Sequence, residues 1–557
     1  MKNIFIKTAV VGLLALGMSS CSDDLNISSI DPHSSPSYDL NELLAKQYAT
    51  LGLTGQKGGA GKPDLSMDEG ESAFYRTVFN LQDMPSDECL WAWQGDTDVP
   101  AITNLSWTSS STRANWCYSR LAYDVTLYNQ FITKEAENAG PQVTAEVRFL
   151  RALHYYYFLD LFHKAPFKDK FDTSLPVEKS GKDLYDWIDQ ELTEIEPQLA
   201  EIGSYDDSKN FGRADQGAVY ALHAQLALNS AVYTDGKVKD YQKAKDYCDK
   251  IINSGKYALS TQAKNGWTGY EQLFMGDNDQ NQQAMKEIIF PIRQDGNSTE
   301  EYGGSTFLVS STCGAGMPYR NINNYWTCYF AREDLVKKFF PTAANIPHAT
   351  EKQVKDYTGT TESQVIAYDD SLGVSTKDVQ KKAGDDRALF YMGVGGGYRT
   401  LNPGKTISGF LNGASIVKWT NYRTDGGARH NDTYSDTDIP LFRLGVIYLT
   451  RAEAEWRLGD DDNAIKDINV LRARAHANTI ASVDKQTLID EWCRETFFEG
   501  RRRSDLVRFG EFTGSSYLWD FKGGVAGGTG VDSHYNVYPI PAIDIAGNPN
   551  MTQNPGY

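Results

Sequence analysis

Aromatic and polar side chains gather early in the chain in a pattern suited to binding sugars. Residues 67–98 read MDEGESAFYRTVFNLQDMPSDECLWAWQGDTD. Trp91 and Trp93 stand two positions apart, so both would project from one face of an extended segment. A pyranose has apolar C–H faces and a rim of hydroxyl groups, so aromatic rings beside polar groups form its natural receptor. The polar candidates in this segment are Asp68, Arg76 and Asp96.

Two further aromatic candidates lie far along the chain, in segments rich in glycine or asparagine. Tyr302 precedes a pair of glycines, and Trp326 ends the run NINNYW. The alternative for the two early tryptophans is that both belong to the core. A glycoside hydrolase would need two carboxylates about 5 to 10 Å apart across the scissile bond. The carboxylates near the aromatic residues, none in a sequence setting typical of a general acid, are Asp68, Asp87, Glu88 and Asp96.

Two oxygen-rich runs could hold a hard cation such as Ca²⁺ if the fold brings them together. Asp279 lies in DNDQN, which alternates like a calcium loop but lacks the glycine and glutamate that an EF-hand needs. Asp436 and Asp438 form the second run. The alternative is that these carboxylates are solvated turn residues.

The composition excludes some partners. Asp and Glu number 73 against 55 Lys and Arg, which gives a net charge of -18. Nucleic-acid binders need a basic surplus, so we expect no nucleic-acid partner. The seven cysteines show no CxxC pair and predict no zinc site or disulfide framework. A length of 557 residues favours two or more subdomains.

Helical hairpins are the elements that must position these residues. Residues 441–475 show apolar positions at helical spacing on both sides of Gly459, which predicts two helices joined by a tight turn. Asp461 or Asp462 is expected to cap the second helix. Residues 212–254 predict another hairpin of the same kind, and two such hairpins indicate a tetratricopeptide-like repeat.

The regions between and around the hairpins differ in character. Residues 143–162 predict a helix buried on most sides, and residues 488–508 predict a helix in which Glu499 pairs with Arg502 or Arg503. Gly, Asn, Asp and Thr dominate residues 257–437, so loops and short strands are expected there. The prolines near the C-terminus argue against a helix.

The start of the chain is typical of an exported lipoprotein. Basic residues precede an apolar run that is too short to span a membrane and that ends in small residues before Cys21. Residues 1–20 are therefore predicted to be a signal peptide, with Cys21 as the lipidated first residue of the mature protein. The alternative is ordinary signal cleavage beside an incidental cysteine.

Several segments taken together resemble the SusD/RagB family of outer-membrane glycan-binding lipoproteins. They are RFLRALHYYYFLDLF with HKAPF, FGRADQGAVYALHAQLAL, LFRLGVIYLTRAEAEWRLGD, RETFFEGRRRSDLVRFG and YPIPAIDIAGNPNMTQNPGY. The likeness covers nearly the whole chain. Four other segments, DEGESAFYRTVFN, DECLWAWQ, FPIRQDG and SDTDIPLFRL, resemble the starch-binding founder of the family more than the family at large.

The resemblance implies a mainly α fold, in which tetratricopeptide-like hairpins carry a large loop-rich, short-strand insertion. Residues 21–557 would form one glycan-binding protein with an aromatic arc for α-glucan. The helical scaffold would span about 39–51, 143–256 and 439–510, and the loop-rich binding part about 52–130 and 257–437. The arc would comprise Trp93, Tyr302 and Trp326, with Trp91 near it.

The resemblance also implies roles for the polar residues. Asp68 and Arg76 match sugar contacts of the founder. Asp96 stands where the founder has Asn, so amide donation is lost there, although a carboxylate can still accept from hydroxyl groups. The region that resembles the founder's calcium site includes Asp279, Asp436 and Asp438.

The implied function is capture of starch or malto-oligosaccharides at the cell surface, without catalysis. The implied partner is a SusC-like TonB-dependent outer-membrane transporter, alongside other surface glycan-binding lipoproteins and amylases. The alternatives are a binder of another glycan, a glycoside hydrolase, or a helical scaffold that binds only protein. The scaffold alternative predicts that the aromatic loops are buried.

Overall fold

The computed structural model describes most of the chain beyond residue 38. The described residues are 39–55, 63–68, 70–207, 209–314, 317, 319–347, 376–392, 407 and 413–557. The predicted signal peptide and Cys21 lie outside them. Two parts are distinguished, one ending at Lys46 and one from Gln47 to Tyr557. The account below concerns the second part.

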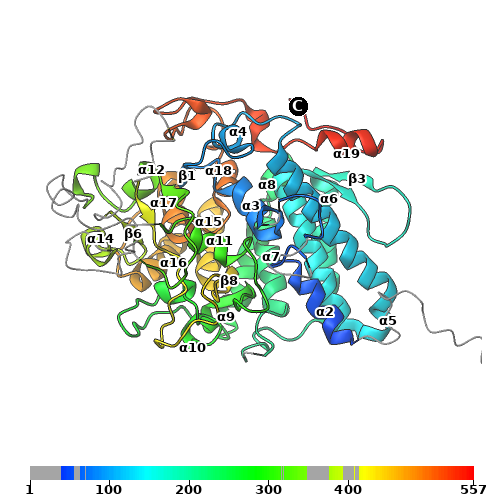
Figure 1. Ribbon diagram of the computed structural model, residues 1–557, viewed down its shortest axis with the longest axis horizontal. Helices are drawn as coiled ribbons and strands as arrows, with labels where there is room; N and C mark the ends of the chain where they lie inside the picture. Colours follow the sequence, from blue (N-terminus) through cyan, green and yellow to red (C-terminus); the bar gives the residue numbers. More distant parts are fainter. Residues whose placement is uncertain are drawn as a thin grey trace, which may run out of the picture. The chain divides into compact units, whose positions relative to one another are not determined.

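The helical half is built on one long element and a stack of shorter helices (Figure 1). Helix α5 runs Thr112–Phe162 and has a non-helical residue, Gly140, at a break before Pro141. The stack pairs α7 with α9, α9 with α15 and α15 with α16. The remaining bounds are α6 Gly181–Ile195, α7 Gln216–Leu228, α8 Ser230–Tyr233, α9 Tyr241–Asn253, α15 Leu444–Leu458, α16 Asp461–Arg474, α17 Lys485–Thr496 and α18 Arg502–Arg508.

The predicted hairpins are confirmed, and the fold places them side by side. Gly459 ends α15 in the left-handed conformation, with φ 85°, as the turn requires. The cap of α16 is Asp460, whose side chain accepts from the Asn463 backbone, so the expected cap at Asp461 or Asp462 is wrong by one or two positions. Helices α9 and α15 face each other, although some 190 residues separate them.

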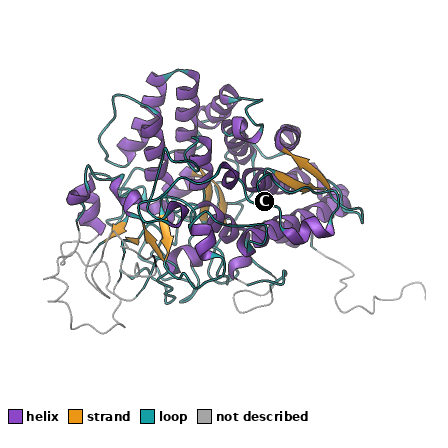
Figure 2. Ribbon diagram, turned by 90° about the horizontal axis from the view of Figure 1, so that it is seen from above, coloured by secondary structure: helices purple, strands orange, loops and turns teal. Residues whose placement is uncertain are grey.

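Loops and two-stranded sheets make up much of the rest, although the β2–β3 sheet lies against α5 and α6 of the helical half (Figure 2). Among the described residues the strands pair antiparallel as β1 with β5, β2 with β3, β4 with β8 and β6 with β7. The short strands expected in residues 257–437 are therefore present. The strand bounds are β1 Cys89–Trp91, β2 Lys164–Phe167, β3 Val177–Ser180, β4 Ile288–Ile292, β5 Tyr329–Ala331, β6 Phe390–Tyr391, β7 Ser415–Ile416 and β8 Ile439–Arg443.

Three local expectations need correction. The region assigned to loops at 52–130 contains α3 Phe74–Gln82, α4 Val99–Thr103 and the first part of α5. A break from Phe497 to Arg501 divides the helix expected at 488–508. A short helix, α19 Ala542–Gly547, follows Pro541, because proline is tolerated at the start of a helix.

Buried ion pairs join the two halves. Glu499 pairs with Arg443 and Lys418, instead of the expected Arg502 or Arg503. Arg502 instead binds Asp87, which lies more than 400 residues earlier in the chain. Internal ion pairing was predicted correctly, but its partners come from other elements. Six cysteines lie among the described residues; all are buried and none is in a disulfide, namely Cys89, Cys117, Cys248, Cys313, Cys328 and Cys493.

No helix among the described residues combines the length and hydropathy that a membrane crossing needs.

Candidate functional site

A short sheet brings the two tryptophan-bearing segments together. Strands β1 and β5 pair antiparallel, with Trp91 opposite Tyr329. Beyond the strand, the Ala92 N–H donates to the Cys328 carbonyl at 2.7 Å. The chain that carries Trp93 therefore runs beside the chain that carries Trp326, although 233 positions separate them in the sequence.

The predicted arc residues lie in one continuous aromatic cluster. The Tyr302 and Trp326 ring centroids are 6.0 Å apart, and those of Trp91 and Trp93 are 6.3 Å apart. Buried Phe307 links the two pairs, at 6.2 Å from Trp326 and 6.5 Å from Trp91. Trp93 is 41% exposed, while Tyr302 and Trp326 are half-buried. We call Trp93, Trp326 and Tyr302, together with Tyr434 described below, the aromatic surface.

Arg76 holds the cluster together from below. Its guanidinium lies 5.1 Å from the Trp326 ring centroid and 4.7 Å from that of Phe307, within cation–π range. It also donates to the Tyr302 carbonyl at 3.3 Å and pairs with Glu71 at 3.1 Å. Only 6% of Arg76 is exposed. Arg76 therefore positions the rings, and only a small part of its side chain is open to a ligand.

Close backbone packing sets the place of Tyr302. A side chain at Gly303 would meet the Ala73 Cβ at 2.1 Å, and one at Gly70 would meet the Tyr302 Cβ at 2.9 Å. These glycines let the Tyr302 loop pack directly on the segment that precedes α3, which carries Arg76. The glycine pair after Tyr302 thus serves packing in this fold.

The two early tryptophans do not share a face. Trp91 is 1% exposed and Trp93 is 41% exposed, with their rings at 82°. The extended segment ends at Trp91, so the alternation expected for a longer strand does not continue. The core alternative is thus correct for Trp91. Its indole N–H donates to the Asp96 Oδ2 atom at 3.0 Å, which fixes Asp96 beside the exposed ring.

The last predicted polar residue is exposed at the edge of the site. Asp68 accepts from the Glu71 backbone N–H at 3.0 Å and otherwise faces solvent. Glu71 in turn pairs with Arg76 and Arg113. Asp68 therefore lies one hydrogen bond away from the charged groups beneath the rings.

Tyr434 belongs to the aromatic surface but was missed by the sequence analysis. Its ring lies 5.3 Å from that of Tyr302, and the two hydroxyl groups are 3.4 Å apart. It stands in a loop two residues before Asp436, where no periodicity marks it. Only the folded structure places it beside a residue 132 positions earlier.

Two of the four carboxylates considered for hydrolysis, Asp87 and Glu88, are buried and do not reach this surface. Asp87 is fully buried; burial alone would raise its pKa, but Arg502 and Lys338 together hold the pKa well below its usual range. Glu88 is 1% exposed and accepts from the Phe498 backbone N–H at 2.9 Å. Burial raises the pKa of Glu88, yet no open face adjoins it. Neither residue can flank a sugar bound on the rings.

The three candidate metal ligands are divided between two different partner side chains. Asp279 and Asp438 share the Arg293 guanidinium, each at 2.9 Å, and Asp436 lies 3.1 Å from the His430 Nδ1 atom. Among the described residues no group of three or more His, Cys, Asp or Glu side chains could hold a metal ion as arranged. Burial raises the pKa of Asp438 to about 8 even though the Arg293 guanidinium lowers it, because a buried site disfavours the charged carboxylate.

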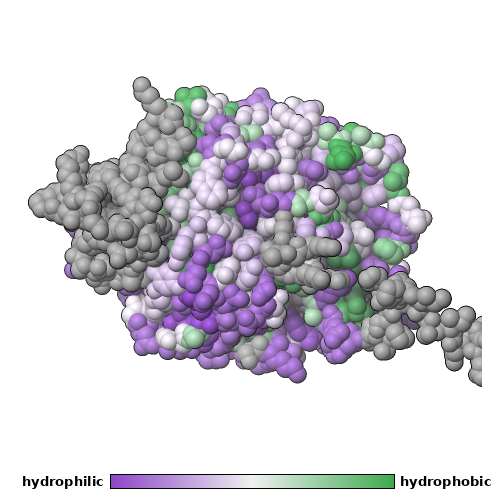
Figure 3. All heavy atoms as spheres, viewed as in Figure 1, coloured by the Kyte–Doolittle hydropathy of each residue, from purple (hydrophilic) through white to green (hydrophobic). Residues whose placement is uncertain are grey.

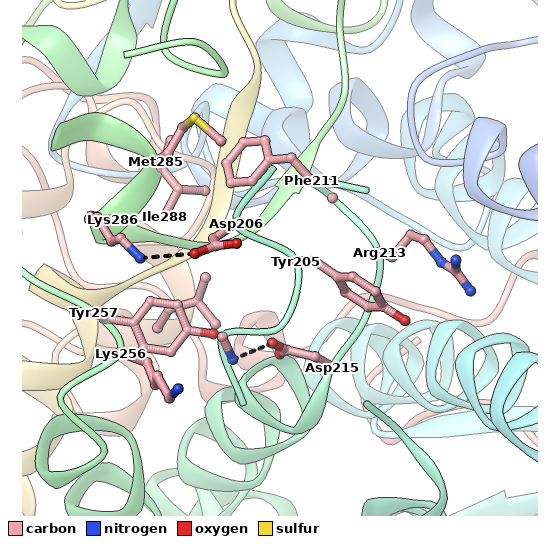
Figure 4. A pocket seen from close by; sticks show the side chains of 13 residues that line it. Tyr205, Asp206, Phe211, Arg213, Asp215, Lys256, Tyr257, Met285, Lys286 and Ile288 are labelled. Atoms are coloured by element: carbon pink, nitrogen blue, oxygen red, sulfur yellow. Dashed lines mark hydrogen bonds and ion pairs between the residues drawn. The ribbon is translucent and has the colours of Figure 1, made fainter. Parts of the chain in front are cut away.

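A small polar pocket at the start of α7 is too narrow for a sugar (Figure 4). Asp215 caps α7 by accepting from Gly217 and Ala218, and it also accepts from the Gly203 N–H at 2.6 Å. An ion pair between Lys286 and Asp206 closes one side. The free volume of about 20 Å³ suits roughly one water molecule.

Other exposed apolar side chains lie on the β2–β3 hairpin and on α19, where Figure 3 shows separate hydrophobic spots. The amides of Asn548 and Asn550 donate to the Pro176 carbonyl at 3.2 and 3.0 Å and tie these segments together. Exposed apolar residues on neighbouring segments are typical of protein contacts. This apolar patch comprises Phe171, Leu175, Val177 and Ile543.

Comparisons with known proteins agree on one family. The SusD family model matches residues 286–557. The chain is 52% identical over 569 residues to the starch-binding protein SusD of Bacteroides thetaiotaomicron, with 100% of each chain covered. A SusD-like protein from Bacteroides fragilis superimposes with a TM-score of 0.63 at 18% identity, covering 95% of this chain and 100% of that protein.

A further structural neighbour was solved with a glycan. Surface glycan-binding protein A from Bacteroides thetaiotaomicron, in complex with laminarihexaose, superimposes with a TM-score of 0.59 at 17% identity. The alignment covers 92% of this chain and 98% of that protein. The identity to SusD over the full length, the family model and the shared fold lead to one conclusion: the chain belongs to the SusD family.

Proposed function

We propose that this protein binds starch or malto-oligosaccharides on the aromatic surface and performs no chemistry on them. The observation that carries the proposal is the set of partly exposed rings, Trp93, Trp326 and Tyr302, backed by Arg76. Tilted rings such as Tyr302 and Trp326, at 55°, suit a curved α-1,4-glucan better than a flat cellulose chain. The full-length identity to a starch-binding protein supports the choice of glycan.

Affinity at one site should be weak. Each aromatic contact adds only about 0.5 to 1.5 kcal/mol, so a few rings give modest binding. Many copies at a cell surface that engage one polymer would recover affinity through multivalency. Retention by polymeric starch is therefore the most sensitive readout.

Affinity electrophoresis in amylopectin gels tests this proposal. Wild-type protein should be retarded, and Trp326→Ala should migrate faster in amylopectin but normally in a plain gel. Phe171→Ala is a matched control, because Phe171 is an exposed aromatic residue on the apolar patch. Unretarded wild type, or equal retardation of Trp326→Ala, would overturn the proposal. Parallel gels with pullulan, dextran and mucin test the alternative that another glycan is bound.

A hydrolase and a protein-only scaffold remain as weaker alternatives. Asp87 and Glu88, two of the carboxylates considered for hydrolysis, are buried beneath the site. The scaffold alternative predicts buried aromatic loops, whereas Trp93 is 41% exposed. Release of reducing ends from starch by the purified protein would favour the hydrolase.

The proposal places the protein on the outer face of the outer membrane, anchored by acyl chains on Cys21. A SusC-like TonB-dependent transporter would receive the glycan, with other surface lipoproteins and amylases nearby. Membership of the SusD family supports this setting. Loss of membrane fractionation in Cys21→Ala tests the anchor. Copurification of the transporter tests the partnership, and Ile543→Glu on the apolar patch is the first variant to examine.

The proposal also includes a structural Ca²⁺ ion held by Asp279, Asp436 and Asp438. Its support is that Asp279 and Asp438 already converge on one cation, the Arg293 guanidinium. The Arg293 side chain is 36% exposed, so it has room to leave. Calcium at 100 times its Kd would then stabilise the fold by about 2.7 kcal/mol. Equal melting temperatures in EDTA and in calcium would remove the ion from the proposal.

A further inference from the structure

A second row of aromatic side chains lies outside the aromatic surface. Tyr422 is its centre: its ring centroid is 6.1 Å from that of Trp267, at 32°, and 6.1 Å from that of Tyr319, at 89°. All three residues are half-buried, so each ring keeps a solvent-facing part. Tyr325, 39% exposed, adjoins the row. Burial raises the pKa of Tyr325 to about 12, and Tyr319 and Tyr422 are among the neighbours that add to the shift.

Hydrogen bonds from three chain segments fix this row. The Asn421 N–H donates to the Arg320 carbonyl at 2.9 Å, which aligns the Tyr422 segment with the Tyr319 segment. The Gly276 N–H donates to the Tyr422 carbonyl at 2.8 Å. The Asn265 amide donates to the Thr424 carbonyl at 2.7 Å and so ties the turn that carries Trp267 to the segment that carries Tyr422. The rings are thus held in place before any ligand arrives.

Polar groups suited to sugar hydroxyls surround the rings. The Arg429 guanidinium lies 5.9 Å from the Tyr319 ring centroid and donates to the Tyr319 hydroxyl. The Tyr319 hydroxyl donates in turn to the Asn323 side chain at 3.0 Å, and Asn323 is exposed. At the other end, the Lys377 ammonium lies 5.6 Å from the Trp267 ring centroid. Aromatic faces with bonding groups at their rims are what a pyranose needs.

Two chain segments join the row to the aromatic surface. Tyr325, which adjoins the row, directly precedes Trp326 of the aromatic surface. Residues 429–434 begin at Arg429 beside Tyr319 and end at Tyr434 beside Tyr302. The Asn323 N–H donates to the Asp432 carbonyl at 2.7 Å, which holds these two segments together. The rings therefore follow one another along shared loops.

We propose that Trp267, Tyr422 and Tyr319 form an extension subsite for the same α-glucan chain that the aromatic surface binds. A short oligosaccharide fills the aromatic surface alone, whereas a long chain continues past Tyr325 onto the second row. This inference rests on the proposed function. Its consequence is a preference for long chains within one molecule, independent of multivalency on the cell.

Isothermal titration with maltotriose and with amylose, on soluble monomeric protein, tests the inference. The double variant Trp267→Ala/Tyr422→Ala should bind amylose about three- to tenfold more weakly, since one or two stacking contacts are lost, and should bind maltotriose as wild type does. Trp326→Ala should weaken both ligands. Phe171→Ala, which removes an exposed ring from the apolar patch, should weaken neither. Melting curves establish that each variant is folded.

Each outcome has a definite meaning. Unchanged amylose affinity in the double variant overturns the extension subsite and leaves the aromatic surface as the binding site. Equal weakening of both ligands overturns it as well, because the second row would then act only by supporting the aromatic surface. Unchanged binding of both ligands by Trp326→Ala overturns the proposed function itself, and the inference with it. If Tyr422→Ala does not fold, Trp267→Ala and Tyr325→Ala are measured in its place.

Discussion

The buried ion-pair cluster and the aromatic surface both join distant parts of the chain, but they do so with opposite chemistry. In the cluster, Glu495 bonds Arg443, Arg387 and Arg474, and all four side chains are 0% exposed. In the aromatic surface, Trp93 is 41% exposed. A buried charge must be matched inside the fold, because an unpaired one is costly. A binding surface instead leaves its ring faces for a ligand. The comparison predicts that changes in the cluster affect stability, while changes at exposed rings affect binding.

The largest effect is expected from Glu495→Ala. Three buried arginines would lose their shared partner, which should lower the free energy of unfolding by about 3 to 5 kcal/mol. Chemical denaturation measures the loss. At a temperature where the variant is folded, retention in amylopectin should match wild type.

The matched control for Glu495→Ala is Glu333→Ala. Glu333 forms a surface pair with Lys337 one helical turn away, at 2.6 Å. Such a pair contributes about 0.2 to 0.5 kcal/mol. A loss in Glu495→Ala no greater than in this control would contradict the distinction between the two regions.

Trp91 and Trp93 show the same contrast between a buried and an exposed side chain only two positions apart. Trp91→Ala empties a fully buried space and should cost about 3 to 5 kcal/mol of stability. Trp93→Ala should leave stability nearly unchanged and weaken maltoheptaose binding about three- to tenfold. Melting curves and titration calorimetry separate the two effects. The reverse assignment, with Trp93 needed for folding and Trp91 for binding alone, would refute the proposed site.

A pH effect of intermediate size is expected from Glu491. Burial, its largest influence, raises the pKa of Glu491, but Arg494, Arg387 and Arg472 together lower it to about 2. The folded pKa thus lies below the unfolded value of 4.5, so the stabilisation is present above pH 4.5 and is lost as pH falls towards 2. Between about pH 5 and about pH 3 wild type should lose about 2 kcal/mol that Glu491→Gln does not lose. Urea unfolding at both pH values measures these losses. Equal losses of stability in wild type and in Glu491→Gln would exclude Glu491 as the cause.

The sequence predicted the helical stack well because its signal is local. Apolar spacing and Gly459 marked the α15–α16 hairpin, and only the cap residue was misplaced. The first part of α5, from Thr112, went unpredicted, although its buried residues Ala114, Leu121, Val125 and Tyr128 recur at helical spacing. The ion-pair partners of Glu499 could not be predicted from the sequence either. Helix spacing indicates partners three or four residues away, whereas in the fold Glu499 pairs with the distant Lys418 and Arg443.

The candidate site was only partly predictable for a related reason. Trp93, Tyr302 and Trp326 were named from their types and from a family resemblance, and the structure brings them into one cluster. Whether a tryptophan faces in or out depends on where a strand ends, which composition does not reveal; Trp91 shows this. Tyr434 and the second row of aromatic residues lie in loops without periodicity. Only their contacts in the folded structure identify them as candidate site residues.

The smallest effect is expected from Asp96→Asn. Asp96 lies between the two regions, because it bonds the buried Trp91 and lies beside the exposed Trp93. The Asp96 Oδ2 atom accepts from the buried Trp91 indole at 3.0 Å, so one side of the carboxylate is occupied by the core. Asp96→Asn keeps an oxygen for that bond and turns the other side into an amide donor. A sugar hydroxyl whose oxygen has no other donor could then accept from this amide, and one such hydrogen bond adds about 0.5 to 1.5 kcal/mol. Maltoheptaose affinity should therefore rise about two- to tenfold with stability unchanged, whereas weaker binding would mean that the carboxylate itself receives the sugar.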